Sequence, residues 1–315
     1  MKTITVLSGK GGVGKSSITA SLAVLLAENH KLITVDCDVD APNLALVLGV
    51  IEDNFQLIDR VRSEQNAKLI KEHCNKCQEC VKACKFQAIN VDGKDFPVIN
   101  DLLCIGCGAC TLVCDDNALK LESVEIAGIR VGETGYGFPN VSAQLNIGKS
   151  GSGNVVNIVK IWASEIAEAI NAEYMVIDSA AGIGCPVIAS VRGSDYVVLV
   201  TEPTPVAFWD LKRAIDIVNH FNINYGVIIN KYDINSDFTE EIEEYFTVNE
   251  IPVLGKIPFD QKFVYALVNL KPAVIFEPEY TGKFLEILKE MIKNINFLDK
   301  YKKTNIKSSL RRPYQ

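Results

Sequence analysis

The sequence predicts an α/β fold in which a mostly parallel central sheet is flanked by helices and interrupted by a small α+β domain. Short apolar segments alternate with longer segments of helical periodicity, and a glycine-rich pattern follows the first of them. Eight of the ten cysteines fall in two clusters within one stretch. We expect strands at 4–7, 32–35, 124–131, 140–145, 174–177, 196–200 and 225–229, and helices at 17–28, 155–170 and 282–297.

Length and composition bound the domain organisation. A chain of 315 residues with 48% hydrophobic content can form one large and one small domain. We expect the large domain at 1–58 and 124–299, the insertion at 59–123, and a disordered basic tail at 300–315.

The same features favour some surroundings over others. No apolar run approaches the ~20 residues that cross a bilayer, and no signal peptide precedes the first strand. A net charge of −7 argues against broad nucleic-acid binding. Clustered cysteines are typical of metal ligation rather than disulfides, so we predict a reducing, cytoplasmic location.

Residues 9–16, Gly-Lys-Gly-Gly-Val-Gly-Lys-Ser, form a phosphate-binding pattern between the first expected strand and helix. Glycines let successive N–H groups turn inward on phosphate oxygens, and the helix start adds a positive dipole end. Lys15 would then reach the β- and γ-phosphates, and the Ser16 hydroxyl would bind Mg²⁺. The expected nucleotide-binding residues are Gly11, Gly12, Val13, Gly14, Lys15, Ser16 and Ser17.

A second lysine, Lys10, follows the first glycine of this pattern. With it, residues 10–16 resemble the deviant Walker A motif of MinD/ParA-type ATPases, a group that includes the nitrogenase iron protein and the Mrp-type iron–sulfur carriers. The resemblance implies a P-loop NTPase fold and a homodimer or heterodimer that encloses ATP between its subunits. In that family the lysine matching Lys10 reaches the partner's nucleotide, so Lys10 and Lys15 are expected to be catalytic.

Three aspartates follow expected strands, where ligands of open α/β sheets bind. Asp36 and Asp38 are two residues apart and would point to one side of an extended chain. The resemblance implies that Asp38 orients or activates the attacking water and that Asp36 contacts magnesium-bound water. Asp178 ends an apolar strand, the Walker B arrangement that holds Mg²⁺. The segment 178–186 resembles the family's switch II, with Gly182 as its hinge.

The insertion contains an internal repeat of Cys-x-x-Cys-x-x-Cys-x-x-x-Cys. This resembles the bacterial-type ferredoxin with two [4Fe–4S] clusters, in which the fourth cysteine of each run ligates the other cluster. Zinc is the alternative for paired Cys-x-x-Cys motifs, although two complete runs of equal spacing argue against it. The implied ligand sets are Cys74, Cys77, Cys80 and Cys114 for one cluster, and Cys104, Cys107, Cys110 and Cys84 for the other.

Cys185 lies seven residues beyond Asp178. A ligand of the subunit-bridging cluster occupies the corresponding place in the nitrogenase iron protein. A bridging cluster needs a second cysteine from each subunit, and the sequence offers none between 124 and 178. We therefore interpret Cys185 as a small, partly buried apolar residue.

The last expected strand ends in Asn230-Lys231-Tyr232-Asp233. The family resemblance implies that Asn230 hydrogen-bonds the adenine ring and that Pro258, in a later segment, lines its other side. Asp233 keeps GTP as an alternative to ATP.

Three functions are compatible with these sequence features. The first is an ATPase in which the nucleotide gates electron transfer through two clusters to an unknown redox or metalloprotein partner. The second is an ATP-dependent assembly or carrier protein for iron–sulfur or other metal cofactors. The third is a MinD-like regulatory switch whose insertion senses redox state.

Overall fold

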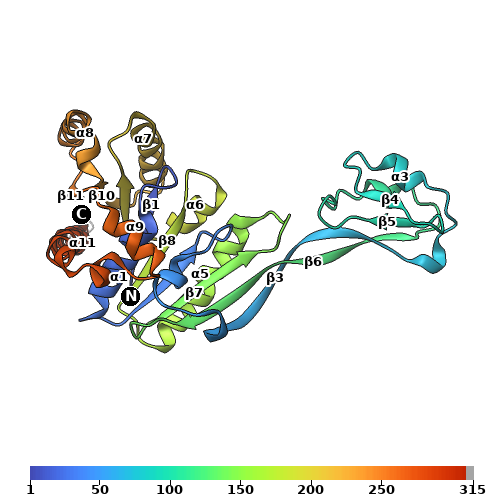
Figure 1. Ribbon diagram of the computed structural model, residues 1–315, viewed down its shortest axis with the longest axis horizontal. Coiled ribbons are helices and arrows are strands. Elements are labelled where there is room, and N and C mark those ends of the chain that lie inside the picture. Colours follow the sequence, from blue (N-terminus) through green and yellow to red (C-terminus); the bar gives the residue numbers. More distant parts are fainter. Residues whose placement is uncertain (310–315) are drawn as a thin grey trace, which may run out of the picture.

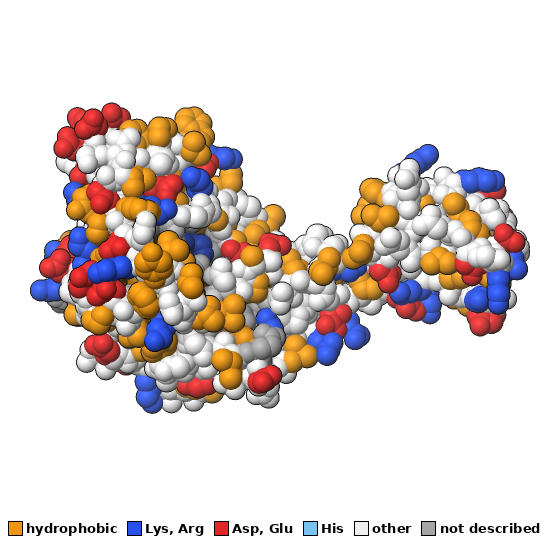
Figure 2. Space-filling view, viewed as in Figure 1, with side chains coloured by type: hydrophobic (Ala, Val, Ile, Leu, Met, Phe, Trp, Pro, Cys, Tyr) orange, Lys and Arg blue, Asp and Glu red, His pale blue; other side chains and the backbone are white. Residues whose placement is uncertain are grey.

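The computed structural model describes residues 1–309, without the side chains of Glu52 and of residues 298–309. It contains a large body and a small lobe joined by a narrow waist (Figures 1 and 2). The strands are β1 (Lys2–Ser8), β2 (Leu32–Cys37), β3 (Phe55–Leu69), β4 (Ile89–Val91), β5 (Pro97–Ile99), β6 (Leu119–Glu133), β7 (Pro139–Leu145), β8 (Tyr174–Ala181), β9 (Tyr196–Thr201), β10 (Asn224–Asn230) and β11 (Val253–Ile257).

Helices connect these strands. They are α1 (Lys15–Ala27), α2 (Leu44–Val47), α3 (Glu79–Ala83), α4 (Ala109–Leu112), α5 (Ser152–Ala169), α6 (Cys185–Val191), α7 (Pro205–His220), α8 (Ser236–Val248), α9 (Gln261–Val268), α10 (Ala273–Phe276) and α11 (Thr281–Ser309). Short 3₁₀ turns lie at η1 (Glu52–Asn54), η2 (Lys71–His73), η3 (Tyr232–Ile234) and η4 (Pro278–Tyr280).

The body is built on one sheet with the order β11-β10-β9-β1-β8-β2-β7-β6-β3 among the described residues. Every neighbouring pair from β11 to β7 is parallel, and only β6 runs antiparallel to its two neighbours. The predicted mostly parallel sheet is therefore confirmed. Because parallel strands end at one edge, the residues that follow β1, β2, β8 and β9 come together there.

Helices cover both faces of the sheet, which is why its central strands are continuously apolar. In β9, Val198 and Val200 pack on the side of α1 and α11, whereas Val197 and Leu199 pack on the side of α7. A third cluster of buried side chains fills the space between α5 and strands β2, β7 and β8. The rigid layers hold the loops at the sheet edge in fixed positions.

The ribbon β3–β6 joins the body to the lobe (Figure 1). The two strands pair from Phe55 opposite Gly132 to Leu69 opposite Leu119. Strand β6 pairs with β7 only from Ala127 to Glu133, so the rest of the ribbon extends away from the sheet. The sequence predicted no strand at 55–69, and it predicted a strand only at 124–131 where β6 extends from Leu119 to Glu133. The expected insertion boundaries, 59 and 123, fall inside this ribbon.

The chain end differs in extent from the expectation. Helix α11 begins at Thr281, as the periodicity predicted, and continues to Ser309. The tail expected from residue 300 overlaps its last turns, and residues 310–315 lie outside the described part of the chain. In the part that the structure describes, no helix is long and apolar enough to cross a membrane.

Candidate functional site

The phosphate-binding loop connects β1 to α1 in the manner that the sequence predicted. Gly12 and Gly14 have φ values of 81° and 91°, which strongly favour glycine. A Cβ on Gly14 would lie 2.5 Å from the Asn230 amide nitrogen, so this glycine is also required by space. Helix α1 starts at Lys15 with no side-chain cap, so its first N–H groups are left for a ligand.

Lys15 makes a buried ion pair at the base of this loop. Its Nζ lies 2.7 Å from Asp178 Oδ1, and the two side chains are 7% and 1% exposed. Thr19 donates a hydrogen bond to the same carboxylate oxygen at 2.9 Å. The other oxygen, Asp178 Oδ2, is buried without a hydrogen-bond partner. A buried carboxylate oxygen of this kind fits the coordination or water shell of Mg²⁺.

The two aspartates after β2 take different positions. Asp36 is fully buried, and its carboxylate accepts hydrogen bonds from the backbone N–H groups of Asp38, Asn43 and Leu44 at 2.9–3.0 Å. Burial, with the nearby charge of Asp178, raises the pKa of Asp36 to about 7. Because the chain turns after Cys37, the Asp36 carboxylate organises this loop and does not line the nucleotide pocket.

Asp38 instead faces the pocket beside the phosphate-binding loop. Burial raises the pKa of its carboxyl, while the charge of Lys15 opposes that rise. The pocket has a volume of about 410 Å³ and combines glycines and polar groups with an apolar wall. It is lined by Ser8, Gly11, Gly12, Gly14, Lys15, Ser16, Ser17, Asp38, Asn43, Leu46, Val47, Ala181, Leu267 and Leu270.

Asn230 and Lys231 hold the phosphate-binding loop from the side. Asn230 Nδ2 donates to the Val13 carbonyl at 2.8 Å, and Lys231 Nζ donates to the Gly12 carbonyl at 3.0 Å. The Asn230 side chain is thus committed to the loop in this geometry rather than open to a base. Lys10 lies nearby, with its Nζ 3.2 Å from Glu202, a residue that the sequence did not single out.

The segment expected to line the base lies at the end of β11. Pro258 follows this strand and is not among the residues that line the pocket. Asp233 Oδ1 accepts a hydrogen bond from the Phe259 N–H at 2.6 Å, which ties this segment to η3. Figure 2 shows hydrophobic side chains gathered on the surface over α9, the helix that supplies Leu267 to the pocket wall.

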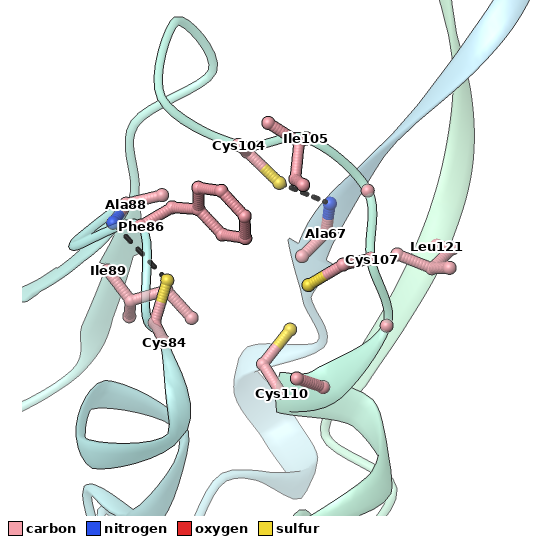
Figure 3. A pocket seen from close by; sticks show the side chains of 13 residues that line it. Ala67, Cys84, Phe86, Ala88, Ile89, Cys104, Ile105, Cys107, Cys110 and Leu121 are labelled. Atoms are coloured by element: carbon pink, nitrogen blue, oxygen red, sulfur yellow. Dashed lines mark hydrogen bonds between the residues drawn. The ribbon is translucent and has the colours of Figure 1, made fainter.

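The eight clustered cysteines surround two separate cavities in the lobe. Figure 3 shows the side chains of one cavity, into which the fourth cysteine of the first run and three cysteines of the second run point. The cysteines of this cavity are Cys84, Cys104, Cys107 and Cys110, and those of the other are Cys74, Cys77, Cys80 and Cys114.

Backbone groups around both cavities follow the internal repeat. Positive φ values occur at Lys76 and Gln78 in the first run and at Gly106 and Gly108, 30 positions later, in the second. The sulfur of Cys84 accepts a hydrogen bond from the Ala88 N–H at 3.3 Å, and that of Cys114 accepts one from Ala118 at 3.2 Å. The Cys104 sulfur accepts one from Ala67 at 3.4 Å. Backbone N–H groups that point at a sulfur stabilise the negative charge of a metal-bound thiolate.

The lobe does not present a site for one ion. Within the described residues, no three His, Cys, Asp or Glu side chains converge on a position that could hold a metal ion. The thiols are instead spread around the cavity walls (Figure 3).

Cys185 lies outside the lobe, at the first residue of α6, and it is exposed rather than partly buried as predicted. Its neighbour across the surface is Gly153, where a Cβ would lie 2.9 Å from the Cys185 Cβ. The close approach leaves no room for a larger residue at the start of α5.

Comparison with known proteins agrees with this geometry. Residues 4–273 match the family described as the CobQ/CobB/MinD/ParA nucleotide binding domain. The chain therefore belongs to the MinD/ParA group of nucleotide-binding P-loop proteins.

Relatives of several kinds share this domain. The uncharacterised protein MJ0578 of Methanocaldococcus jannaschii is 37% identical over 74% of this chain and 79% of its own. An iron-sulfur cluster carrier protein from the same organism is 24% identical, over 93% of this chain and 84% of its own. The septum site-determining protein MinD of Pyrococcus horikoshii, solved with Mg-ADP, has a TM-score of 0.56 and 20% identity, over 92% and 95% of the two chains.

Proposed function

We propose that the protein is an ATPase in which two copies enclose ATP and the nucleotide state controls electron transfer through two [4Fe–4S] clusters in the lobe. The observation that carries the electron-transfer half is the grouping of eight cysteines around two cavities, each with three thiols from one run and one from the other.

The nucleotide half rests on the phosphate-binding loop and its surroundings. Lys15 would exchange part of its pairing with Asp178 for the β- and γ-phosphates, since one ammonium group has three donors. Ser16 and Asp178 would hold Mg²⁺, with the unpaired Asp178 oxygen as the acceptor. Asp38 faces the same pocket and would orient the attacking water. Asn230 would hydrogen-bond the adenine ring beside the loop that it holds, and Pro258 would line the other side of the ring.

The lobe half rests on thiol placement. In each cavity two cysteines of one run come from a loop and a third comes from the short helix after it, whereas the fourth cysteine belongs to the other run and follows α3 or α4. When bound there, a four-iron cluster would accept and release single electrons. The N–H groups of Ala67, Ala88 and Ala118 would stabilise thiolate charge at three of these sulfurs.

A contact between the body and the lobe supports coupling of the two halves. Lys149, in the loop between β7 and α5, donates to the Asn66 side chain at 3.3 Å and to the Asp101 carbonyl at 3.4 Å. Asn66 belongs to the ribbon, and Asp101 is three residues from Cys104. The same loop continues to Gly153, which packs on Cys185 within the expected switch II. A displacement of that switch would therefore reach the edge of one cavity.

The proposal is tested by electron delivery from the anaerobically reduced protein to a viologen dye. We expect the rate to differ between ATP and ADP, and the difference to disappear in Lys15→Ala, which keeps all eight lobe cysteines. Equal rates with ATP, with ADP and in Lys15→Ala would contradict nucleotide control. Cys185→Ser is the matched cysteine control, and we expect it to retain the full iron content.

A second candidate function is the delivery of iron–sulfur clusters, because several relatives are named iron-sulfur cluster carrier proteins. It differs in one measurable result. A carrier would transfer iron and sulfide together to an apo-ferredoxin and lose its own absorbance, whereas an electron carrier would keep both while changing redox state.

A further inference from the structure

Glu202 is a buried carboxylate that joins two lysines of the nucleotide site. It follows β9, and its side chain is 9% exposed. One of its oxygens lies 3.2 Å from Lys10 Nζ, and the other lies 2.8 Å from Lys231 Nζ. Burial raises the pKa of Glu202, but the pairs with Lys231 and Lys10 more than offset this and hold it below its ordinary value. The carboxylate is therefore ionised at neutral pH.

Lys231 fixes where Glu202 can be. It adopts a left-handed backbone conformation with φ 54°, and its Nζ also donates to the Gly12 carbonyl. Glu202 is consequently tied to the phosphate-binding loop through Lys231. A carboxylate held in this way cannot move outward with Lys10. Any displacement of the Lys10 side chain must break the 3.2 Å pair.

We propose that Glu202 is a positioning residue that holds Lys10 against its own subunit until a nucleotide-bound second copy takes it. The inference rests on the proposed function, in which Lys10 of one copy reaches the nucleotide of the other. In this role the Lys10 side chain extends outward to the second molecule, and that movement breaks its 3.2 Å pair with Glu202, which Lys231 holds back. The Lys10–Glu202 ion pair thus opposes dimer formation, and its strength contributes to the dissociation constant of the dimer.

The size of the effect follows from exposure. The Lys10 side chain is 38% exposed, so its ion pair is partly screened. Pairs of this kind change an equilibrium by about two- to fivefold. Two such contacts open when two copies associate. The dissociation constant of the ATP-bound dimer should therefore fall by about 4- to 25-fold when the charge of Glu202 is removed.

The first measurement needs neither ATP nor a partner. Glu202→Gln keeps the shape and one oxygen acceptor but removes the charge. We expect acetylation of Lys10 by an amine-reactive ester, followed by mass spectrometry of the nucleotide-free protein, to become about two- to fivefold faster. Glu290→Gln is the matched control, because Glu290 pairs with the exposed Lys293 on α11. Glu290→Gln should leave the rate of Lys10 acetylation unchanged.

A second variant separates the contact from general loosening of the loop. Lys231→Ala removes the tie to Gly12 but leaves Glu202 to pair with Lys10 alone. The proposal expects Lys10 to react no faster than in the wild type. If Lys231→Ala and Glu202→Gln both accelerate the reaction, the effect comes from loop mobility and the inference is wrong.

The closing measurement is sedimentation of the wild type and Glu202→Gln with a non-hydrolysable ATP analogue. Tighter association of Glu202→Gln, lost again in Lys10→Ala/Glu202→Gln, supports the proposal. Unchanged Lys10 reactivity in Glu202→Gln overturns it even when ATP-dependent dimers form. Absence of dimers in the wild type at every concentration contradicts the proposed function, and the role of Glu202 fails with it.

Discussion

The body and the lobe are stabilised by different means. Three clusters of buried aliphatic side chains surround the sheet of the body. The lobe has one small cluster, in which Cys80, Ile89 and Cys110 pack with Ala67 and Leu119 at the end of the ribbon, and two of these five buried residues are candidate ligands. A core of this size does not offset the entropy of ordering a lobe of 70–118. The body can therefore fold on its apolar core, whereas in the lobe the proposed clusters would supply the stabilisation that its small core lacks.

The largest expected effect is loss of the lobe alone. Cys80 is 7% exposed and lines one cavity, so Cys80→Ser should remove about half of the iron and make 70–118 sensitive to protease. Nucleotide binding by the body should persist. Limited proteolysis with peptide mapping and iron analysis measure both.

Cys185→Ser provides the control for this experiment, because Cys185 is exposed and lies outside both cavities. A lobe that stays resistant to protease in Cys80→Ser would show that its apolar contacts suffice. The contrast between the two regions would then be wrong.

The second effect concerns the buried pair in the body. In Lys15→Ala the buried Asp178 carboxylate keeps only the hydrogen bond from the Thr19 hydroxyl. We therefore expect the free energy of unfolding to fall by about 3 kcal/mol. Adding Asp178→Asn should recover much of that loss, since the uncompensated charge is gone. Urea denaturation of the single and double variants measures it, and additive losses would contradict a coupled pair.

The third effect is a pH dependence of the nucleotide-free body. Burial, with Asp178 nearby, raises the folded pKa of Asp36 to about 7. The folded chain therefore binds more protons at this group than the unfolded chain does between pH ~4 and ~7. In this window the contribution of Asp36 to the free energy of unfolding falls as pH rises, by at most about 1.4 kcal/mol per pH unit.

Asp36→Asn isolates that contribution. The variant loses a backbone hydrogen bond at every pH, so the slope rather than the absolute stability is compared. We expect a flatter profile between pH 5 and 7 than in the wild type, measured by urea denaturation. Parallel profiles would show that Asp36 keeps an ordinary pKa.

The smallest effect lies where the body touches the lobe. Lys149→Ala removes the contacts to Asn66 and Asp101, and we expect a change of about 1 kcal/mol or less. Amide exchange should become faster at 100–104 while α1 is unaffected. Lys68→Ala, which removes an exposed pair to the same Asp101, is the control for simple loss of charge. Equal exchange in both variants would contradict a specific role for Lys149.

The sequence predicted what depends on local pattern. The loop at 9–16, the strand before Asp178 and the helix after Lys15 are set by residue types that are neighbours in the chain. Glu202 and the loop contacts of Asn230 were missed because they depend on β9 and β10 lying in order beside β1. The strand at 55–69 was missed because charged residues interrupt it and neither of its faces is continuously apolar.

The spacing of the cysteines in the sequence also could not show that the fourth cysteine of each run lies near the other run. Cys84 and Cys114 are close to the opposite run only because α3 and α4 pack together in the lobe. The family resemblance supplied that arrangement. The expectation that Asp36 and Asp38 share one side assumed an extended chain through both residues, whereas β2 ends at Cys37.

Strand β3 is the outer edge of the sheet and is 15 residues long. Unpaired edges of this length recruit strands from other molecules and lead to aggregation. Here the pairing register with β6 shifts at three places between Leu57 and Glu64, and the exposed side chains of Arg60 and Arg62 place charge along the same stretch. Irregular spacing and exposed charge make a poor template for another strand. The long outer strand that carries the lobe is thereby kept from forming a sheet shared between molecules.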